Sequence, residues 1–267
     1  MLLRLRLVVI LLAGIGAMPA AERLTISGSS TVQPLVAEIA RRFEERHPEL
    51  RIDVQGGGSS RGVVDVRSGR AHIGMLSRAP TAEERDLKGT IIARDGIACI
   101  VHRNNPLTGL TSVEVADLFT GRTASWQALT GIDRSVVIVS KAEGRATLEL
   151  FLAHFRLKAD QIRAQVVIGD NAQGIKTVAA NPDGIGYVSI GAAETDIAAG
   201  VAIRLVPLDG VTPTSAAVAD ATWPLARPLT LVTTGSPSAT VQAFLTYAAS
   251  SAVDDLIIDL AFVPPPR

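Results

Sequence analysis

The sequence has a single cysteine, Cys99, so no disulfide can form within the chain. Cys99 lies in the apolar stretch 96–101, where a free cysteine is expected to act as a small buried hydrophobic residue. Because no cysteine lies near the end of the apolar N-terminal segment, we expect no lipid anchor. A disulfide-stapled small domain is excluded as a class.

The chain also lacks an excess of charge. Lysine and arginine together number 26, and aspartate and glutamate together number 26. Such a balance offers no broad electrostatic attraction to nucleic acid or to an anionic membrane surface. We therefore expect no nucleic-acid partner, and any anionic ligand must be bound by local groups.

No apolar run reaches the roughly 20 residues that a membrane-spanning helix needs. The longest candidate, residues 7–17, follows Arg4 and Arg6 and precedes the small residues Ala20 and Ala21. This order is typical of a secretory signal peptide, which we place at residues 1–21. An uncleaved anchor or a buried first helix is the alternative. The signal predicts export, and a free periplasmic location follows from it.

Short β-branched segments alternate with helical periodicity along the rest of the chain, which predicts an α/β fold with a parallel or mixed sheet. A late return of the chain after a loop-rich stretch suggests two lobes. We assign residues 22–95 and 205–267 to lobe 1 and residues 96–204 to lobe 2. Expected strands are 24–27, 51–55, 71–76, 96–102, 136–140, 186–190 and 229–233; expected helices include 32–43, 112–119, 147–155 and 241–249.

Three strand-to-helix turns share one design of glycine and hydroxyl residues: 28–31, 56–62 and 141–147. Helix N-termini carry unpaired amides and a partial positive charge, so they stabilise anions. Glycine permits close approach of the backbone, and serine or threonine adds neutral donors. Any one turn alone is more simply explained as ordinary helix capping. The candidate ligand residues are Ser29, Ser30, Thr31, Gly58, Ser59, Ser60, Arg78, Lys141, Gly144, Arg145, Ala146 and Thr147.

Longer segments carry a family resemblance. The stretch LTISGSSTVQPLVAEIARRFEERHPELRIDVQGGGSSRGVVDVRSGRAHIGMLSRAP resembles the opening of the periplasmic phosphate-binding proteins of ABC importers. VSKAEGRATLELF is similar to their second-lobe phosphate loop, and NPDGIGYVSI and RPLTLVTT to their later strands. The resemblance implies a two-lobed type II periplasmic binding protein fold, a monomer without cofactor or catalytic activity, phosphate as ligand and a membrane permease as partner.

The same resemblance implies ligand contacts at Ser30, Thr31, Ser59, Lys141, Arg145 and Thr147, with Ser60 beside them. The chain departs from the family where Arg78 replaces an aspartate that is often present, and where Lys141 replaces an arginine. A carboxylate accepts the proton of monohydrogen phosphate and repels sulfate, so its absence affects selectivity. Arg78 and Arg145 are expected either to grip the anion or to form salt bridges. Glu143 is an alternative acceptor, or only a helix-start residue.

Other functions stay open. Residues 58–62 satisfy G-x-S-x-G, which would make Ser60 a hydrolase nucleophile, although His72, His102 and His154 lie in no catalytic context. The histidines and Cys99 have no metal-ligand spacing. Residues 169–177 imitate a nucleotide loop but lack its G-K-T order. A sensor or scaffold with the same fold, or a binder of sulfate or molybdate, remains possible.

Overall fold

The computed structural model describes residues 22–266, so the expected signal peptide lies outside the described residues. The strands are β1 (Glu22–Gly28), β2 (Leu50–Gly56), β3 (Ile73–Leu76), β4 (Leu87–His102), β5 (Val137–Lys141), β6 (Val166–Ile168), β7 (Gly184–Ser189), β8 (Ile203–Leu205) and β9 (Ala226–Thr234). The helices are α1 (Gln33–Glu44), α2 (Ser59–Arg67), α3 (Ser112–Phe119), α4 (Gln127–Thr130), α5 (Ala146–Phe155), α6 (Asn171–Ala179), α7 (Ile190–Ala198), α8 (Ser215–Ala219), α9 (Ala239–Ala248) and α10 (Asp254–Asp259), with 3-10 turns at Ala82–Glu84, Ala159–Gln161 and Ser251–Val253.

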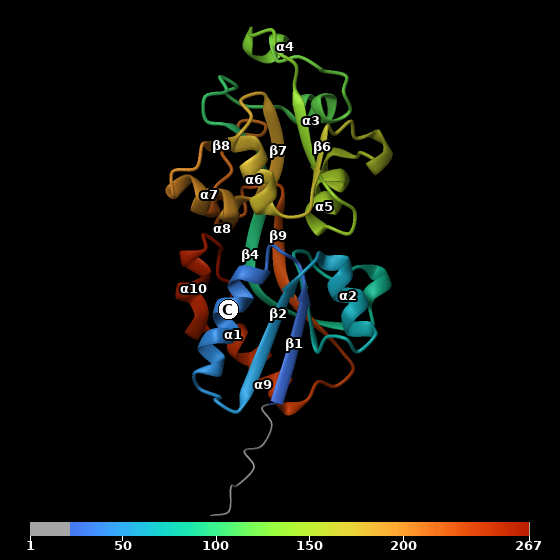
Figure 1. Ribbon diagram of the computed structural model, residues 1–267, viewed down its shortest axis with the longest axis vertical. Coiled ribbons are helices and arrows are strands. Elements are labelled where there is room, and N and C mark those ends of the chain that lie inside the picture. The colour runs from blue at the N-terminus through green and yellow to red at the C-terminus, as the bar shows by residue number, and fades with distance from the viewer. Residues whose placement is uncertain (1–21, 267) are drawn as a thin grey trace, which may run out of the picture.

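Two lobes share one continuous sheet, as Figure 1 shows. Its strand order is β2-β1-β3-β9-β4-β7-β5-β6, with β8 paired to β4. The strands β1, β2 and β3 run parallel to one another in lobe 1, and β5, β6 and β7 do so in lobe 2. Antiparallel β4 and β9 pass between the lobes. The predicted two-lobed α/β fold is therefore confirmed.

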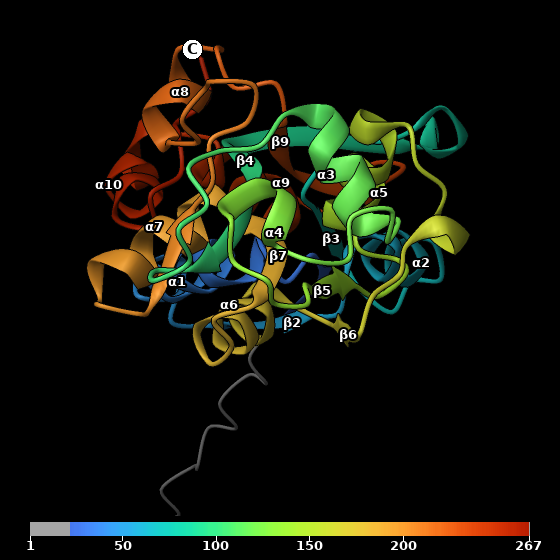
Figure 2. The same ribbon diagram turned by 90° about the horizontal axis from the view of Figure 1, so that it is seen from above.

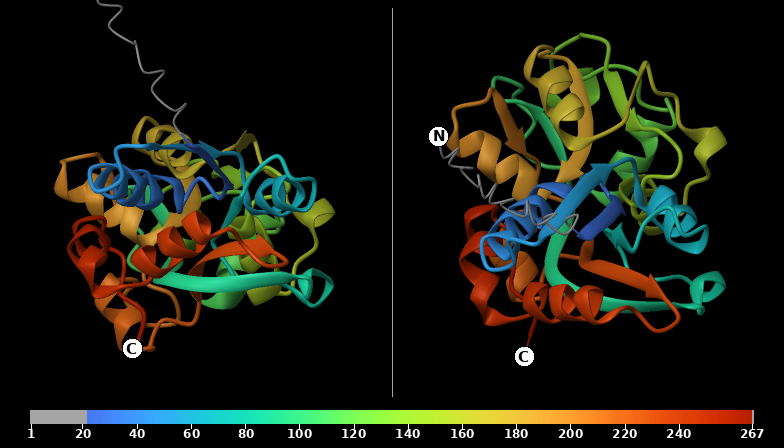
Figure 3. Two further views of the ribbon diagram at one scale, coloured as in Figure 1. Left: turned by 90° about the horizontal axis from the view of Figure 1, so that it is seen from below. Right: turned by 60° about the horizontal axis from the view of Figure 1, so that its bottom comes forward.

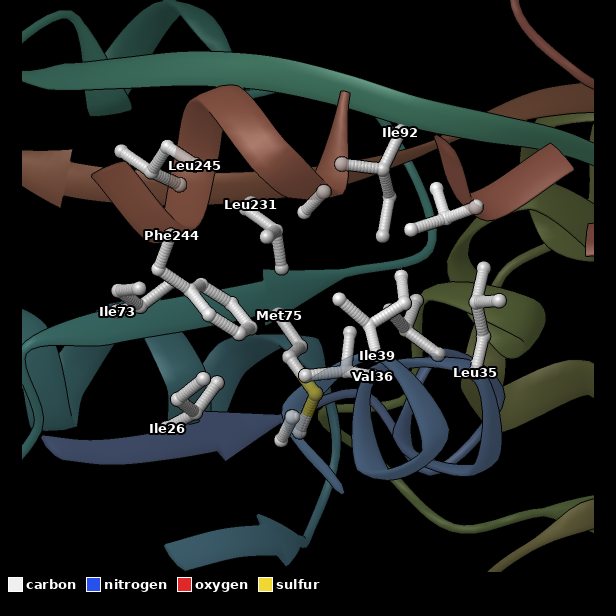
Figure 4. Close-up of a cluster of buried hydrophobic side chains, with 14 of the residues drawn as sticks. Ile26, Leu35, Val36, Ile39, Ile73, Met75, Ile92, Leu231, Phe244 and Leu245 are labelled. Carbon is white, nitrogen blue, oxygen red and sulfur yellow. The ribbon is translucent and has the colours of Figure 1, made fainter. Parts of the chain in front are cut away.

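The core of lobe 1 forms because α1 presents one apolar face. Pro34 lies in the first turn, where proline costs no hydrogen bond, and the buried residues recur at helical spacing. They meet residues of β1, β3, β9 and α9 in one cluster (Figure 4), which includes Ile26, Leu35, Val36, Ile39, Ile73, Met75, Leu231 and Phe244. Each such side chain contributes about 1.5 to 3 kcal/mol on burial. The C-terminal helices α9 and α10 complete this lobe by packing against α1 (Figure 3).

Lobe 2, which faces the viewer in Figure 2, has its own core. That core contains Val206, Val218, Trp223 and Leu225, which belong to the stretch expected in lobe 1 from residue 205 onward. The indole of Trp223 also donates to the carbonyl of Ile97, 3.0 Å away, beneath β4. The return crossing is therefore β9 itself, and the boundary predicted at residue 205 is too early. These apolar residues are spread over loops and one short helix, so the sequence has no helical or strand periodicity that would predict their packing in lobe 2.

Strand β4 begins at Leu87, well before the predicted start at residue 96. The part of β4 before residue 96 contains Lys88, Arg94 and Asp95, which weaken any sequence signal for a strand. Pairing with β9 over Leu87 to Gly96 supplies the hydrogen bonds instead. Tertiary pairing thus overrides local propensity in the segment that joins the lobes.

Candidate functional site

Four helix N-termini meet at a small cavity between the lobes. Helices α1, α2 and α5 begin at the three turns singled out in the sequence, and α6 joins them from lobe 2. Unpaired amides at these helix starts give the cavity a positive potential. Its lining residues are Ser29, Ser30, Thr31, Gly58, Ser59, Ser77, Lys141, Arg145, Ala146, Thr147, Gly169, Asp170 and Asn171.

Lobe 1 contributes hydroxyl groups whose oxygen atoms already accept hydrogen bonds. The hydroxyl oxygen of Ser59 accepts from the Ser77 amide at 3.2 Å, and that of Ser29 accepts from the Thr31 amide at 3.2 Å. Both serines are at most 2 % exposed. Because each oxygen is engaged as an acceptor, each hydroxyl proton can be donated to a ligand. This side of the cavity is thus set up to donate.

Gly58 allows the lobes to come this close. Its φ of +110° is one that other residues rarely adopt, and a Cβ there would lie 2.6 Å from the carbonyl oxygen of Gly144 in lobe 2. The adjacent Ser60 amide donates to that carbonyl at 3.3 Å. The α2 N-terminus and the loop before α5 therefore touch directly, as in a closed conformation.

Lys141 brings a buried amine to the lobe 2 side, at 5 % exposure. Its Nζ donates to the carbonyl oxygen of Asp170 at 2.8 Å and to Oδ1 of Asn171 at 3.1 Å. Burial, together with the positive charges of Arg227 and Arg145 and against the opposing effect of Asp170, lowers the pKa of Lys141 to about 7. An anion in the cavity would favour the protonated amine.

Arg227, on the crossing strand β9, was not among the residues predicted to lie at the site. It forms an ion pair with Asp95 of β4 at 2.9 Å, in which the two side chains are 2 % and 1 % exposed. It also donates to the hydroxyl oxygens of Ser77 at 3.3 Å and Thr147 at 2.9 Å. Asp95 balances the charge of Arg227. Among the residues that line the cavity, Lys141 and Arg145 are basic and Asp170 is acidic.

The predicted residues Ser60, Arg78 and Gly144 do not line the cavity. Arg78 instead makes salt bridges to Glu84 at 2.7 Å and to Glu149 at 2.8 Å. Of the two roles expected for Arg78, an anion contact or a salt bridge, the structure shows the salt bridge. Gly144 contacts the other lobe through its carbonyl. Glu143 is exposed and lines a neighbouring depression, not this cavity.

The hypothesis that Ser60 is a nucleophile requires a histidine beside it, but the hydroxyl has another partner. The Ser60 hydroxyl donates to the carboxylate of Glu149 at 3.3 Å. The nearest histidine in sequence, His72, accepts from the Thr25 amide on β1. A hydrolase of the Ser-His-Asp type needs a histidine base at its nucleophile, and within residues 22–266 the Ser60 hydroxyl has a carboxylate partner instead.

Four lining residues were missed: Ser77, Gly169, Asp170 and Asn171. A signal for the last two was present, since an aspartate beside an asparagine favours a helix start, and the Asp170 carboxylate does accept from the Gln173 amide at 2.8 Å. The stretch that imitates a nucleotide loop thus contains the N-terminus of α6 and most of that helix. Asn171 further donates to the Thr31 hydroxyl across the lobes at 3.2 Å.

Residues 22–266 show neither a membrane-spanning helix nor a metal cluster. No helix there has the length and apolar character to span a bilayer. No cluster of three or more histidine, cysteine or acidic side chains is placed to hold a metal ion within the same residues.

A family model and a curated relative match most of the chain. The model for the PBP superfamily domain matches residues 16–252. The phosphate-binding protein PstS of Bacillus subtilis is 29 % identical over 255 residues, which cover 93 % of this chain and 83 % of that protein. This relative is named a phosphate-binding protein, so the comparison gives no support to the hydrolase hypothesis.

Solved structures agree. A putative phosphate ABC transporter substrate-binding protein with bound phosphate, from Clostridium perfringens, has a TM-score of 0.84 and 30 % identity, covering 92 % of this chain and 100 % of that one. An ABC-type phosphate transport receptor from Vibrio cholerae has a TM-score of 0.75 and 26 % identity, with 91 % and 100 % covered. Together with the two lobes and the cavity between them, these matches show that the chain belongs to the PBP superfamily.

Proposed function

We propose that the protein captures inorganic phosphate between its lobes and delivers it to the membrane permease of an ABC importer. The observation that carries this proposal is the inter-lobe cavity, where four helix N-termini and oriented hydroxyls face Lys141 and Arg145. Helix N-termini and charge-assisted donors together replace the water around an oxyanion. The names of the relatives from three bacteria support the choice of phosphate.

The proposed ligand-binding residues are those predicted residues that line the cavity, together with three that the structure adds. In lobe 1 they are Ser29, Ser30, Thr31, Gly58, Ser59 and Ser77; in lobe 2 they are Lys141, Arg145, Ala146, Thr147, Asp170 and Asn171. Arg78, Ser60 and Gly144 are left out of this set because their contacts lie outside the cavity.

Asp170 bears on the choice between phosphate and sulfate. It is the one carboxylate among the residues that line the cavity. One of its oxygens accepts from the Gln173 amide, and a carboxylate has further acceptor capacity. Monohydrogen phosphate carries a proton that such a group can accept, whereas sulfate carries none. Asp170 can therefore perform the task that the family often gives to an aspartate at the position of Arg78.

Titration calorimetry with phosphate, sulfate and molybdate tests this function on the wild type and on Asp170→Asn. We expect phosphate to bind tightly to the wild type and the preference over sulfate to shrink in the variant, which keeps the helix cap. If the wild type does not bind phosphate but binds sulfate or molybdate, that anion, and not phosphate, is the ligand.

Export to the periplasm is part of the proposal and rests on the predicted signal at residues 1–21. A sensor or scaffold would use the same cavity and closing motion but act through a receptor. Phosphate uptake in a strain that lacks the protein separates the two roles. Uptake must fall if the protein serves an importer and stay unchanged if it serves a receptor only.

A further inference from the structure

An ion pair connects the lobes beside the cavity without lining it. Arg78 follows β3 in lobe 1, and its Nε donates to Oε2 of Glu149, on α5 of lobe 2, at 2.8 Å. The two side chains are 15 % and 40 % exposed. The pair therefore forms only when the lobes approach, at a place partly shielded from solvent.

Within lobe 1, the Arg78 side chain is already held in the orientation that this contact needs. The Nη1 and Nη2 atoms of Arg78 bind both oxygens of Glu84 at 2.7 and 2.8 Å. Glu84 is itself fixed by the Thr81 amide at 2.9 Å and is among the buried charged residues. Such a forked pair orients the guanidinium and leaves Nε as the free edge. Little side-chain entropy remains to be lost when Glu149 arrives.

Glu149 is also contacted from lobe 1 by the Ser60 hydroxyl at 3.3 Å. It lies in the first turn of α5, two residues after Thr147, which lines the cavity together with Ala146. Holding Glu149 against lobe 1 therefore holds the N-terminus of α5 against the ligand.

We propose that Arg78 and Glu149 are positioning residues that latch the closed lobes and set how long the anion is retained, without touching it. The inference rests on the proposed function for its ligand, but the latch acts on lobe closure itself. It assigns a role to the arginine that stands where an anion-contacting aspartate is often found in the resembling family. It also predicts that the ion pair changes release more than capture, because the contact forms after the anion has entered.

The test uses Glu149→Gln in the full exported chain, with Glu143→Gln as the matched control. Both lose one carboxylate from the same loop and helix start, but Glu143 is exposed and lies outside the cavity lining. Engineered cysteines at the exposed positions Gln127 and Gln242, one in each lobe, carry dyes for single-molecule energy transfer. Stopped-flow measurements with inorganic phosphate give the association and dissociation rates.

We expect Glu149→Gln to speed phosphate release by about three- to ten-fold, with association within about two-fold, and to lower the closed fraction of the ligand-free protein. Glu143→Gln should match the wild type. Equal release rates and equal closed fractions in the two variants would overturn the latch. If the wild type shows no response to phosphate, the proposed ligand fails, while the ligand-free comparison of the variants still decides on the latch.

Discussion

Ser59 is a buried hydroxyl whose oxygen is occupied by the Ser77 amide, which leaves its proton for the ligand. Replacing it in Ser59→Ala removes one donor from a dry site. We expect binding of phosphate to weaken by about 1 to 3 kcal/mol, measured by titration calorimetry. Ser68→Ala, at the exposed end of the same helix, should change binding by less than about 0.5 kcal/mol. An unchanged affinity in Ser59→Ala would remove this residue from the site.

Lys141 makes binding depend on pH, because its pKa of about 7 leaves the amine partly neutral in the empty site. An anion favours the protonated form, so binding above about pH 7 must take up a proton, and affinity must fall as pH rises. Calorimetry near pH 8 in buffers of different ionisation enthalpy measures this uptake.

Lys141→Arg is the control for that uptake, since arginine stays charged at all these pH values. Phosphate itself exchanges protons equally with both proteins, so the difference between them reports Lys141. We expect less proton uptake and a flatter pH profile in the variant. Identical uptake in the two proteins would show that Lys141 does not titrate on binding.

At the scale of elements, the α2 N-terminus can contribute to a closed binding site only if the loop before α5 packs directly against it. In Gly58→Ala, the added Cβ would meet the carbonyl oxygen of Gly144, so the lobes should close incompletely. We expect a loss of affinity of at least about ten-fold by calorimetry, together with roughly 1 to 3 kcal/mol of destabilisation from the positive φ.

Gly69→Ala separates those two effects. Gly69 also has a positive φ, of +70°, but a Cβ there would meet nothing within 4 Å. This variant should lose stability in chemical denaturation and keep its affinity. Affinity lost to the same extent in both variants would mean that strain, and not lobe contact, explains Gly58→Ala.

At the scale of the whole molecule, a ligand held by both lobes stabilises the folded chain as a unit. At a phosphate concentration about 100-fold above Kd, the added stability is about 2.7 kcal/mol, which corresponds to a rise in Tm of about 5 to 10 °C for a chain of this size. Thermal unfolding with sodium chloride at equal ionic strength is the comparison. An equal rise with chloride would indicate general screening instead of a site.

Much of the architecture could be predicted because it depends on local pattern. Apolar residues at helical spacing identified α1, and glycine and hydroxyl turns identified three of the four helix starts at the cavity. The resemblance added the expectation of phosphate. These features are encoded over a few consecutive residues, so they are visible without the fold.

The sequence by itself determined the alternation of strands and helices, and it placed Ser59 and Thr147 at helix starts, and Lys141 in the turn before one, where an anion can bind. Only the tertiary structure decided which charges face the ligand and which face each other. It paired Arg227 with Asp95 over 132 positions of sequence and turned Arg78 toward Glu149. Such choices depend on distance across the gap between the lobes, because a charge binds whichever partner the closed fold brings within a few ångströms.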